Sequence, residues 1–296
     1  MATIPEPVQQ GLQAFLRSNS ETKTPRPQFS PIGGGCINHG GKLTTADGEY
    51  FFLKWNHDAK FPGMFEKEAR GLELLYASRA IRIPRVLGAV RCDPYQFILM
   101  EFIESRQRSR VYWDLLGQRL ALLHRNTSEF FGLDYDNFIG SLPQSNTPDQ
   151  SWIEFFITRR LEIQLKAGVD SGGIDASIVT KFERLYPKLS EILTVEPPAL
   201  LHGDLWSGNL IADEKGEPCL IDPAVYYGNR EVDLAMTRLF GGFDERFYEA
   251  YEEAFSTPPG LDERLSIYNL YPLLVHVNLF GGGYLQQVTS ILRAYA

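Results

Sequence analysis

Cysteine, long apolar runs and positive charge are all scarce in this chain of 296 residues. The three cysteines, Cys36, Cys92 and Cys219, are widely spaced, which fits neither a zinc site nor a disulfide framework. No apolar run approaches the roughly 20 residues that a membrane-spanning helix needs. The first seven residues lack the basic and apolar regions of a signal peptide. We therefore expect a cytoplasmic protein with no membrane partner.

The charge balance excludes a further class of partner. Lys and Arg number 29 against 37 for Asp and Glu, which gives a formal net charge of −8. No strongly basic stretch offsets this balance, so nucleic acid is not an expected partner. Hydrophobic residues make up 44% of the chain, enough to build one large or two moderate domains with real cores.

The most informative motif is the segment 202–209, HGDLWSGN, followed by Asp222 at the end of an apolar run. Kinase catalytic loops use this spacing: the first Asp accepts the proton of the attacking hydroxyl, and the Asn and the second Asp hold Mg²⁺. These roles fall on Asp204, Asn209 and Asp222. Asp-Gly and Gly-Asn pairs are also ordinary turn residues, but a turn alone does not explain the whole pattern. Residues 209–212 and 218–221 are typical of a hairpin, which would return Asp222 to the other two.

The N-terminal part contains candidates for phosphate binding. Gly33, Gly34 and Gly35 would let backbone N–H groups approach a phosphate without a Cβ in the way, although three glycines are more often a plain turn. Lys54 lies in an aromatic strand at 49–55, one hairpin after these glycines, where a kinase has its phosphate-binding lysine. Taken alone, Lys54 would be interpreted as an exposed lysine on an edge strand.

A helix predicted at 65–77 supplies candidate partners for Lys54. Glu68 shares the inward border of this helix with Leu72, whereas Glu66 shares the polar face with Arg70. We therefore predict that Glu68 pairs with Lys54, the alternative being a solvated helix glutamate.

Two more strands are predicted, at 83–90 and 96–103. The expected site for the nucleotide base lies at the end of the second one. Main-chain groups near Glu101 and Ile103 are predicted to bond adenine, with Met100 beside it. Core packing is the simpler explanation for Met100, and the two roles are compatible.

The order of elements predicts an α+β, bilobal, protein kinase-like fold. Residues 1–103 would form a nucleotide-binding lobe with a small antiparallel sheet and one helix, after an extended entry at 18–31. Residues 104–296 would form a larger helical lobe for catalysis and substrate binding, with ATP between the lobes. Its predicted helices include one around Leu116–Leu123 and others at 152–167, 175–193, 232–240, 244–255 and 261–280, the last bent at Pro272.

The segment after Asp222 indicates the kind of acceptor. Only about ten residues separate Asp222 from the next predicted helix, no Phe-Gly follows it, and no long activation segment is present. Such a short segment suits a small molecule or an exposed appendage of a protein.

At this point the chain resembles the fructosamine kinase, or ketosamine-3-kinase, family. The resemblance runs from about residue 31 to the C-terminus, and Trp206 together with 137–146 separates it from generic aminoglycoside kinases. The matching segments are 33–38, 65–69, 131–140, 143–146, 152–156, 202–209 and 221–224.

The resemblance implies transfer of the γ-phosphate of ATP, with Mg²⁺, to the 3-hydroxyl of a ketosamine. The ketosamine would be a small molecule or a glycated protein, and breakdown of the product would free the amine. By position, Lys54 would hold phosphates, Glu68 would orient it, Asp204 would be the base, and Asn209 and Asp222 would hold Mg²⁺.

The resemblance also implies two substrate contacts. Trp206 would face the sugar, because an indole packs well on the C–H side of a sugar. His276 matches a segment that closes the substrate pocket in the family, although a core histidine explains it equally well.

Two other functions remain open. One is another small-molecule kinase, acting on an aminoglycoside, choline or a sugar. The other is a pseudokinase that binds nucleotide without turnover, which the joint presence of Lys54, Asp204, Asn209 and Asp222 disfavours.

Cys36 raises the question of oligomeric state. It follows the three glycines in a loop that must admit nucleotide, near the charge of Lys54, which favours a reactive thiolate. A monomer or a homodimer linked through Cys36 by oxidation is expected, as in relatives that carry this cysteine. A small buried hydrophobic residue is the alternative interpretation.

Overall fold

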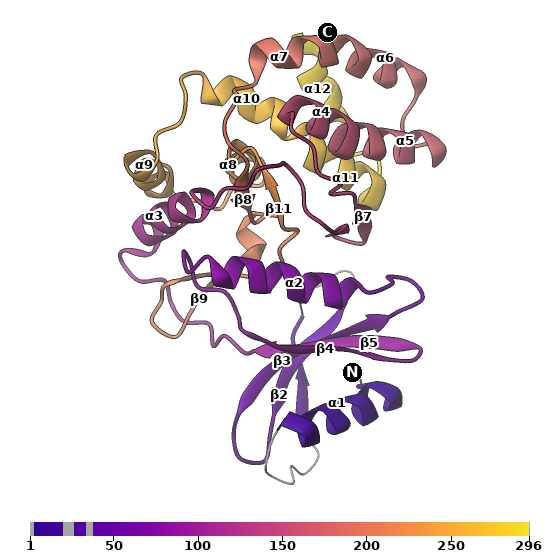
Figure 1. The fold of residues 1–296 in the computed structure, drawn as a ribbon, viewed down its shortest axis with the longest axis vertical. Coiled ribbons are helices and arrows are strands. Elements are labelled where there is room, and N and C mark those ends of the chain that lie inside the picture. Colours follow the sequence, from indigo (N-terminus) through magenta and orange to yellow (C-terminus); the bar gives the residue numbers. More distant parts are fainter. Residues whose placement is uncertain (1–2, 20–26, 34–37, 296) are drawn as a thin grey trace.

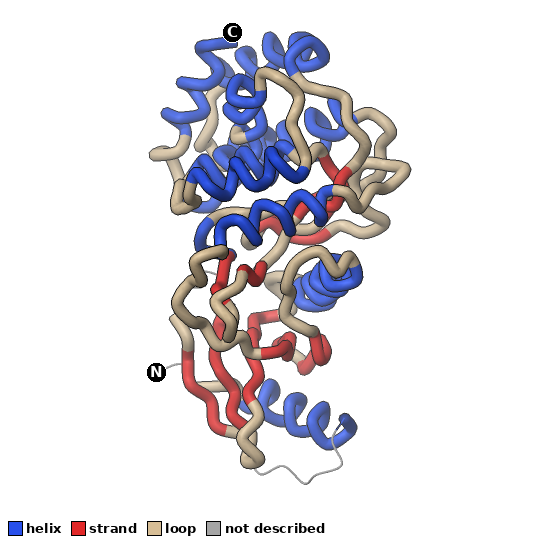
Figure 2. Tube along the Cα trace, turned by 90° about the vertical axis from the view of Figure 1, so that its left-hand side faces the viewer, coloured by secondary structure: helices blue, strands red, loops and turns tan. Residues whose placement is uncertain are grey.

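The computed structural model describes residues 3–19, 27–33 and 38–295, which form two lobes (Figure 1). The N-terminal lobe holds a five-stranded sheet, and the C-terminal lobe is mainly helical. Figure 2, turned by 90°, shows the same separation, with the long strands in one lobe and most helices in the other. The predicted bilobal α+β architecture is confirmed. In the described part of the chain, no helix is both long and apolar enough to cross a bilayer.

The sheet of the N-terminal lobe is antiparallel, with the strand order β1-β2-β3-β5-β4. The two central strands, β3 and β5, pair from Phe51 opposite Glu101 to His57 opposite Tyr95. The strands are β1 (Gln28–Pro31), β2 (His39–Thr44), β3 (Tyr50–His57), β4 (Val86–Cys92) and β5 (Tyr95–Glu101).

Two helices, α1 (Glu6–Asn19) and α2 (Met64–Ala77), cover opposite faces of this sheet (Figure 1). Side chains alternate along a strand, so Phe97 of β5 packs with α1 while Ile98 belongs to the core under α2. On β3, Leu53 and Trp55 belong to the core on the α1 side. Lys54 between them therefore points to the α2 side, toward the second lobe.

The sequence analysis assigned one helix to this lobe, and the structure adds α1 as a second. Val8, Leu12 and Leu16 are its buried residues, spaced four apart, which is the pattern of a helix with one apolar face. Residues 18 and 19 belong to this helix, so the extended entry predicted for 18–31 begins later. Its last part is β1.

The C-terminal lobe contains most of the helices. Those on the side of the N-terminal lobe are α3 (Tyr112–His124) and α8 (Glu231–Leu239). The others are α4 (Trp152–Phe155), α5 (Glu162–Asp170), α6 (Ala176–Leu185), α7 (Leu189–Ile192), α9 (Glu245–Ala254), α10 (Leu261–Tyr268), α11 (Leu270–Phe280) and α12 (Leu285–Tyr295). A π-helical turn, Phe156–Leu161, joins α4 to α5, and a 3₁₀ turn, Tyr186–Lys188, joins α6 to α7.

The helix predicted at 261–280 is two helices, and the predicted bend at Pro272 is wrong. The break lies at Asn269, between α10 and α11. Pro272 lies in the first turn of α11, where backbone N–H groups have no partner within the helix, so the missing N–H of proline costs nothing there.

Two short hairpins and one antiparallel pair of strands that are distant in sequence position polar residues near the junction of the lobes. They are β6 (Asn137–Ile139) with β7 (Leu142–Gln144), β9 (Leu210–Ala212) with β10 (Pro218–Leu220), and β8 (Ala199–Leu201) with β11 (Tyr226–Gly228). The β9–β10 pair is the hairpin that the sequence predicted after Asn209.

Candidate active site

The loop that follows β8 carries the HGDLWSGN motif. Gly203 has φ of 79°, and a Cβ there would lie 2.1 Å from the Ala224 carbonyl oxygen. Only glycine combines this conformation with so close an approach. The loop and the chain around Ala224 are therefore packed backbone to backbone, and the Ala224 N–H donates to the His202 carbonyl at 2.9 Å.

The three predicted catalytic-loop residues lie together. Asn209 Nδ2 donates to Asp204 at the main-chain oxygen (2.8 Å) and at Oδ2 (3.0 Å). It also lies 3.4 Å from the Asp222 carbonyl oxygen, because the β9–β10 hairpin returns the chain to this point. Asp222 has φ of 54°, a conformation that costs energy for a residue with a side chain and that is found at functional sites.

Lys54 joins this group from the N-terminal lobe. Its Nζ lies 2.8 Å from Glu68 Oε1 and is also paired with the Asp222 carboxylate. Glu66 instead lies on the exposed side of α2 and contacts Arg91 at 3.2 Å. The structure thus gives Lys54 the partner that the helix pattern favoured. The roles of these residues in binding phosphate remain predictions.

Burial sets the protonation of this group. It raises the pKa of Asp204 to about 7, the nearby carboxylates of Asp222 and Asp233 add to this effect, and the hydrogen bond from Asn209 opposes it. Burial works against the charged form of Lys54, but the Asp222 and Glu68 carboxylates outweigh it and hold the pKa of Lys54 above its ordinary value. A carboxylate with a pKa near 7 suits proton transfer at neutral pH.

Asp233, which no sequence pattern indicated, anchors the backbone of the catalytic loop. This fully buried carboxylate on α8 accepts the backbone N–H groups of His202 (2.8 Å) and Gly203 (2.9 Å). It also lies 3.2 Å from Nε2 of His124 on α3. Burial alone would raise the pKa of Asp233, but these bonds outweigh it and hold the pKa below its ordinary value. In sequence, an acid in the first turn of a helix is unremarkable, so no local signal marked it.

An aromatic wall lies beside the catalytic loop, which contributes Trp206 to it. We define the wall as Trp206, Phe240, His276, Phe280 and Tyr284. The ring of Phe240 lies 6.3 Å from Trp206 and 4.8 Å from His276, and His276 lies 5.5 Å from Phe280 and 4.9 Å from Tyr284. The two predicted substrate residues, Trp206 and His276, therefore belong to one row of rings.

Two features hold the wall in place. The Trp206 indole is 40% exposed and packs over Gly208, where an added Cβ would lie 2.2 Å from the indole ring. His276 Nδ1 lies 2.7 Å from the Pro272 carbonyl oxygen, to which it donates, and burial lowers the pKa of His276. The histidine is therefore neutral at pH 7, with Nε2 as a hydrogen-bond acceptor.

The predicted base site lies where β5 leaves the sheet. Met100 and Ile103 are buried. The Glu101 side chain is engaged with Arg82 and with the Arg85 N–H, and its own N–H donates to the Arg85 carbonyl at 2.8 Å. Any main-chain bond from Glu101 to a base would therefore use its carbonyl. This role of the segment remains a prediction.

The glycine turn is only partly described. Among the described residues, no atom lies within 4 Å of a Cβ built at Gly33. Gly34, Gly35 and Cys36 lie outside the described residues, so the predicted phosphate-binding and redox roles there are not tested.

A family model for fructosamine kinase matches residues 8–296. The chain belongs to the fructosamine kinase family. It is 41% identical to a probable ketoamine kinase of Synechocystis, with 88% of each chain covered. It is 42% identical to a chloroplastic protein-ribulosamine 3-kinase of Arabidopsis thaliana, covering 90% of this chain and 82% of the relative.

Solved structures agree with this assignment. A putative fructosamine-3-kinase from Thermobifida fusca is similar with a TM-score of 0.83 and 33% identity, covering 90% of this chain and 93% of that one. An aminoglycoside phosphotransferase and a choline/ethanolamine kinase family protein, each below 25% identity, share the fold alone. The resemblance stated from the motifs is confirmed at family level.

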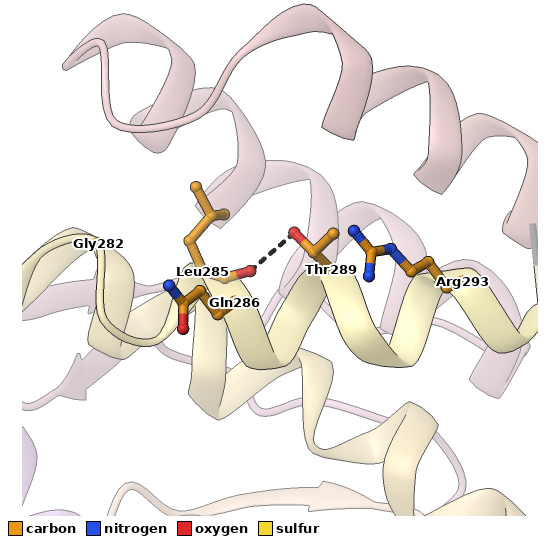
Figure 3. Close-up of a pocket in the computed structure, with 5 residues that line it drawn as sticks. All are labelled: Gly282, Leu285, Gln286, Thr289 and Arg293. Carbon is orange, nitrogen blue, oxygen red and sulfur yellow. Dashed lines mark hydrogen bonds between the residues drawn. The ribbon is translucent and has the colours of Figure 1, made fainter.

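A surface hollow elsewhere in the molecule differs from the interlobe group. It lies along α12 and is lined by Gly282, Leu285, Gln286, Thr289 and Arg293 (Figure 3). Its visible hydrogen bond, from Thr289 Oγ1 to the Leu285 carbonyl at 2.9 Å, stays within the helix. The lining contains no carboxylate.

Proposed function

We propose that this chain is an ATP-dependent kinase that phosphorylates the 3-hydroxyl of ketosamines. The observation that carries the proposal is the interlobe group of Lys54, Glu68, Asp204, Asn209 and Asp222 in a member of the fructosamine kinase family. Relatives named as a ketoamine kinase and a protein-ribulosamine 3-kinase support the choice of acceptor.

Each residue has a task that its position supports. Asp204, with its raised pKa, accepts the proton of the attacking hydroxyl. Lys54 neutralises phosphate charge, and Glu68 orients the Lys54 ammonium group. Because phosphoryl transfer needs positioning more than covalent chemistry, such fixed charges account for most of the expected catalysis.

The residues present fit Mg²⁺. The Asp222 carboxylate and the Asn209 side-chain oxygen are hard ligands, and Mg²⁺ binds one or two such groups while keeping waters and substrate phosphates. Among the described residues, no cluster of three or more His, Cys, Asp or Glu could hold a metal alone, which is consistent with a site completed by nucleotide. When bound, Mg²⁺ would neutralise charge on the phosphates.

The acceptor side favours a ketosamine over an aminoglycoside. Sugar C–H faces pack on aromatic rings, and a secondary ammonium is attracted to ring faces. A polycationic aminoglycoside would instead call for carboxylates, and the kanamycin arm of the test below distinguishes the two acceptors. Breakdown of the 3-phosphorylated adduct would release the amine, so the biological outcome would be deglycation of small molecules or proteins.

The test is ATP consumption, with Mg²⁺, on fructosyl-lysine, ribulosyl-lysine, kanamycin and choline. We expect turnover on one or both ketosamines and a fall in kcat of roughly 10²-fold or more in Asp204→Ala. Turnover confined to kanamycin or choline would show that the acceptor is an aminoglycoside or choline and not a ketosamine. A melting shift with nucleotide but no ATP consumption on any acceptor would favour a pseudokinase.

A further inference from the structure

One fully buried arginine has no carboxylate partner among the residues that the structure describes. Arg160 stands in the π-helical turn Phe156–Leu161 and has no exposed surface. Its Nη1 donates to the main-chain oxygens of Ser145 and Arg159, and its Nη2 donates to Asn146 Oδ1 at 2.7 Å. Its guanidinium also lies 3.9 Å from the ring centre of Tyr226. Burying a charge without a counter-ion is costly, and π-helical turns are frequent at functional sites.

The arginine sets the direction of a chain of hydrogen bonds. A guanidinium has donors only, so the Asn146 oxygen must face it. Asn146 Nδ2 then faces Asn137 Oδ1 at 2.9 Å. With its oxygen occupied, Asn137 presents Nδ2 to the Val225 carbonyl at 2.8 Å. The Arg160 guanidinium, which can only donate, thus fixes the Asn137 amide as the donor to the Val225 carbonyl.

Gln144 adds a second branch. Its Nε2 donates to Asn137 Oδ1 at 2.8 Å and to the Ala224 carbonyl at 3.1 Å, while Tyr271 Oη donates to its Oε1 at 2.7 Å. Gln144, Asn137 and Asn146 are all buried. The two branches therefore hold the carbonyls two and three residues after Asp222.

The segment held in this way touches both halves of the site. Ala224 bonds the catalytic loop through His202, as described above. Val225 packs against α2 at Gly71, where an added Cβ would lie 3.2 Å from Val225 Cγ2. Gly71 is three residues from Glu68, on the next turn of the helix. A shift of this segment would therefore displace Asp222, the catalytic loop and Glu68, the partner of Lys54.

We propose that Arg160 is a positioning residue, which acts through Asn146, Asn137 and Gln144 to hold the segment after Asp222 in its metal-binding position. The inference rests on the proposed role of Asp222 as a metal ligand. Protein kinases order the corresponding segment by phosphorylation. Here a buried donor chain holds it permanently, which suits an enzyme with a short segment and no switch.

The decisive variant is Asn146→Asp. It keeps the size of the side chain and gives Arg160 a carboxylate, so the melting temperature should be kept or raised. It removes the amide donor to Asn137 Oδ1 and to the Tyr135 carbonyl, and it places a carboxylate oxygen against Asn137 Oδ1, which should displace Asn137 from the Val225 carbonyl. We expect the Mg²⁺ concentration for half-maximal rate to rise by about tenfold or more, with little change in KM for the ketosamine.

Two further proteins complete the experiment. Tyr271→Phe removes one hydroxyl from the Gln144 branch, and we expect a smaller rise in the Mg²⁺ requirement. It serves as the test if Asn146→Asp does not fold. The matched control is Asn126→Asp, which removes amide donation to the Leu122 and Leu123 carbonyls at the end of α3 and should leave the Mg²⁺ dependence unchanged.

A readout without an acceptor separates this inference from the proposed function. The melting shift with the non-hydrolysable analogue AMP-PNP is measured across a Mg²⁺ titration, which needs no ketosamine. A wild type that binds Mg²⁺ and AMP-PNP without ketosamine turnover would count against the proposed substrate only. Folded Asn146→Asp and Tyr271→Phe proteins with the wild-type Mg²⁺ midpoint would overturn the role of Arg160.

Discussion

Replacing the proposed base should make the protein inactive and more stable at the same time. Burial raises the pKa of Asp204 from 3.8 to about 7. Ionising this group in the folded protein therefore costs about 4 kcal/mol more than in the unfolded chain. Because the carboxyl is partly exposed, we discount this to about 2 kcal/mol. Asp204→Asn removes that cost and can still accept the hydrogen bond from Asn209.

The pH dependence has a definite sign. The unfolded chain releases the Asp204 proton near pH 3.8, and the folded protein keeps it until about pH 7. The unfolded state binds fewer protons in this window, so Asp204 makes stability fall as pH rises from about 4 to 7. In Asp204→Asn this component is absent. The gain in stability should therefore be partial at pH 5 and complete by pH 8.

Thermal unfolding followed by circular dichroism from pH 5 to 8 measures the effect, beside kcat on the preferred ketosamine. At pH 8 we expect the melting temperature of Asp204→Asn to rise by about 4 °C, with kcat reduced roughly 10²-fold or more. The matched control is Asp47→Asn in the exposed turn between β2 and β3, which should change neither. A loss of activity with an unchanged or lower melting temperature at pH 8 would refute the burial argument. Activity that survives would refute the role of Asp204 as base.

Three other predictions follow from the same geometry. Glu68→Gln should impair ATP use, seen as a higher KM for ATP or lower kcat, while Glu66→Gln should change little because its contact with Arg91 is exposed; equal effects would contradict the assignment. Gly208→Ala should displace the Trp206 indole and raise KM for the ketosamine more than KM for ATP, and unchanged steady-state kinetics would argue against the aromatic wall as the acceptor site. Mild oxidation should give a covalent dimer on a non-reducing gel that is lost in Cys36→Ser and kept in Cys92→Ser; a wild type that stays monomeric on that gel would make Cys36 an ordinary packing residue.

Local patterns were sufficient for much of the fold. The spacing of Glu68 and Glu66 on one helix distinguished the residue that contacts Lys54 from the one that faces solvent. The hairpin after Asn209 followed from two apolar runs around a polar turn. The same kind of signal was available for α1, in the spacing of Val8 and Leu12, and was not used. In each case the information lies within about ten residues.

Long-range partners could not be obtained in this way. Asp233 contacts the backbone of the catalytic loop 30 residues earlier, and a backbone N–H carries no residue-specific signal. The break at Asn269 depends on how α10 and α11 each pack in the C-terminal lobe, whereas the sequence shows one apolar stretch. Arg160 would be placed at the surface by its composition alone, because arginine is almost never fully buried.

Three residues near the site are in environments that are unfavourable for their residue type. Asp204 is half-buried at a cost to its charge, Asp222 holds an unfavourable backbone angle, and Arg160 is a buried charge with no counter-ion in the described part of the chain. Each would destabilise an isolated segment, and each is held by hydrogen bonds: Asp204 and the Asp222 carbonyl by Asn209, and Arg160 by its bond to Asn146. A chain selected for stability alone would lose all three. Their joint presence beside one loop therefore argues that the interlobe region is selected for chemistry, independently of any likeness to known kinases.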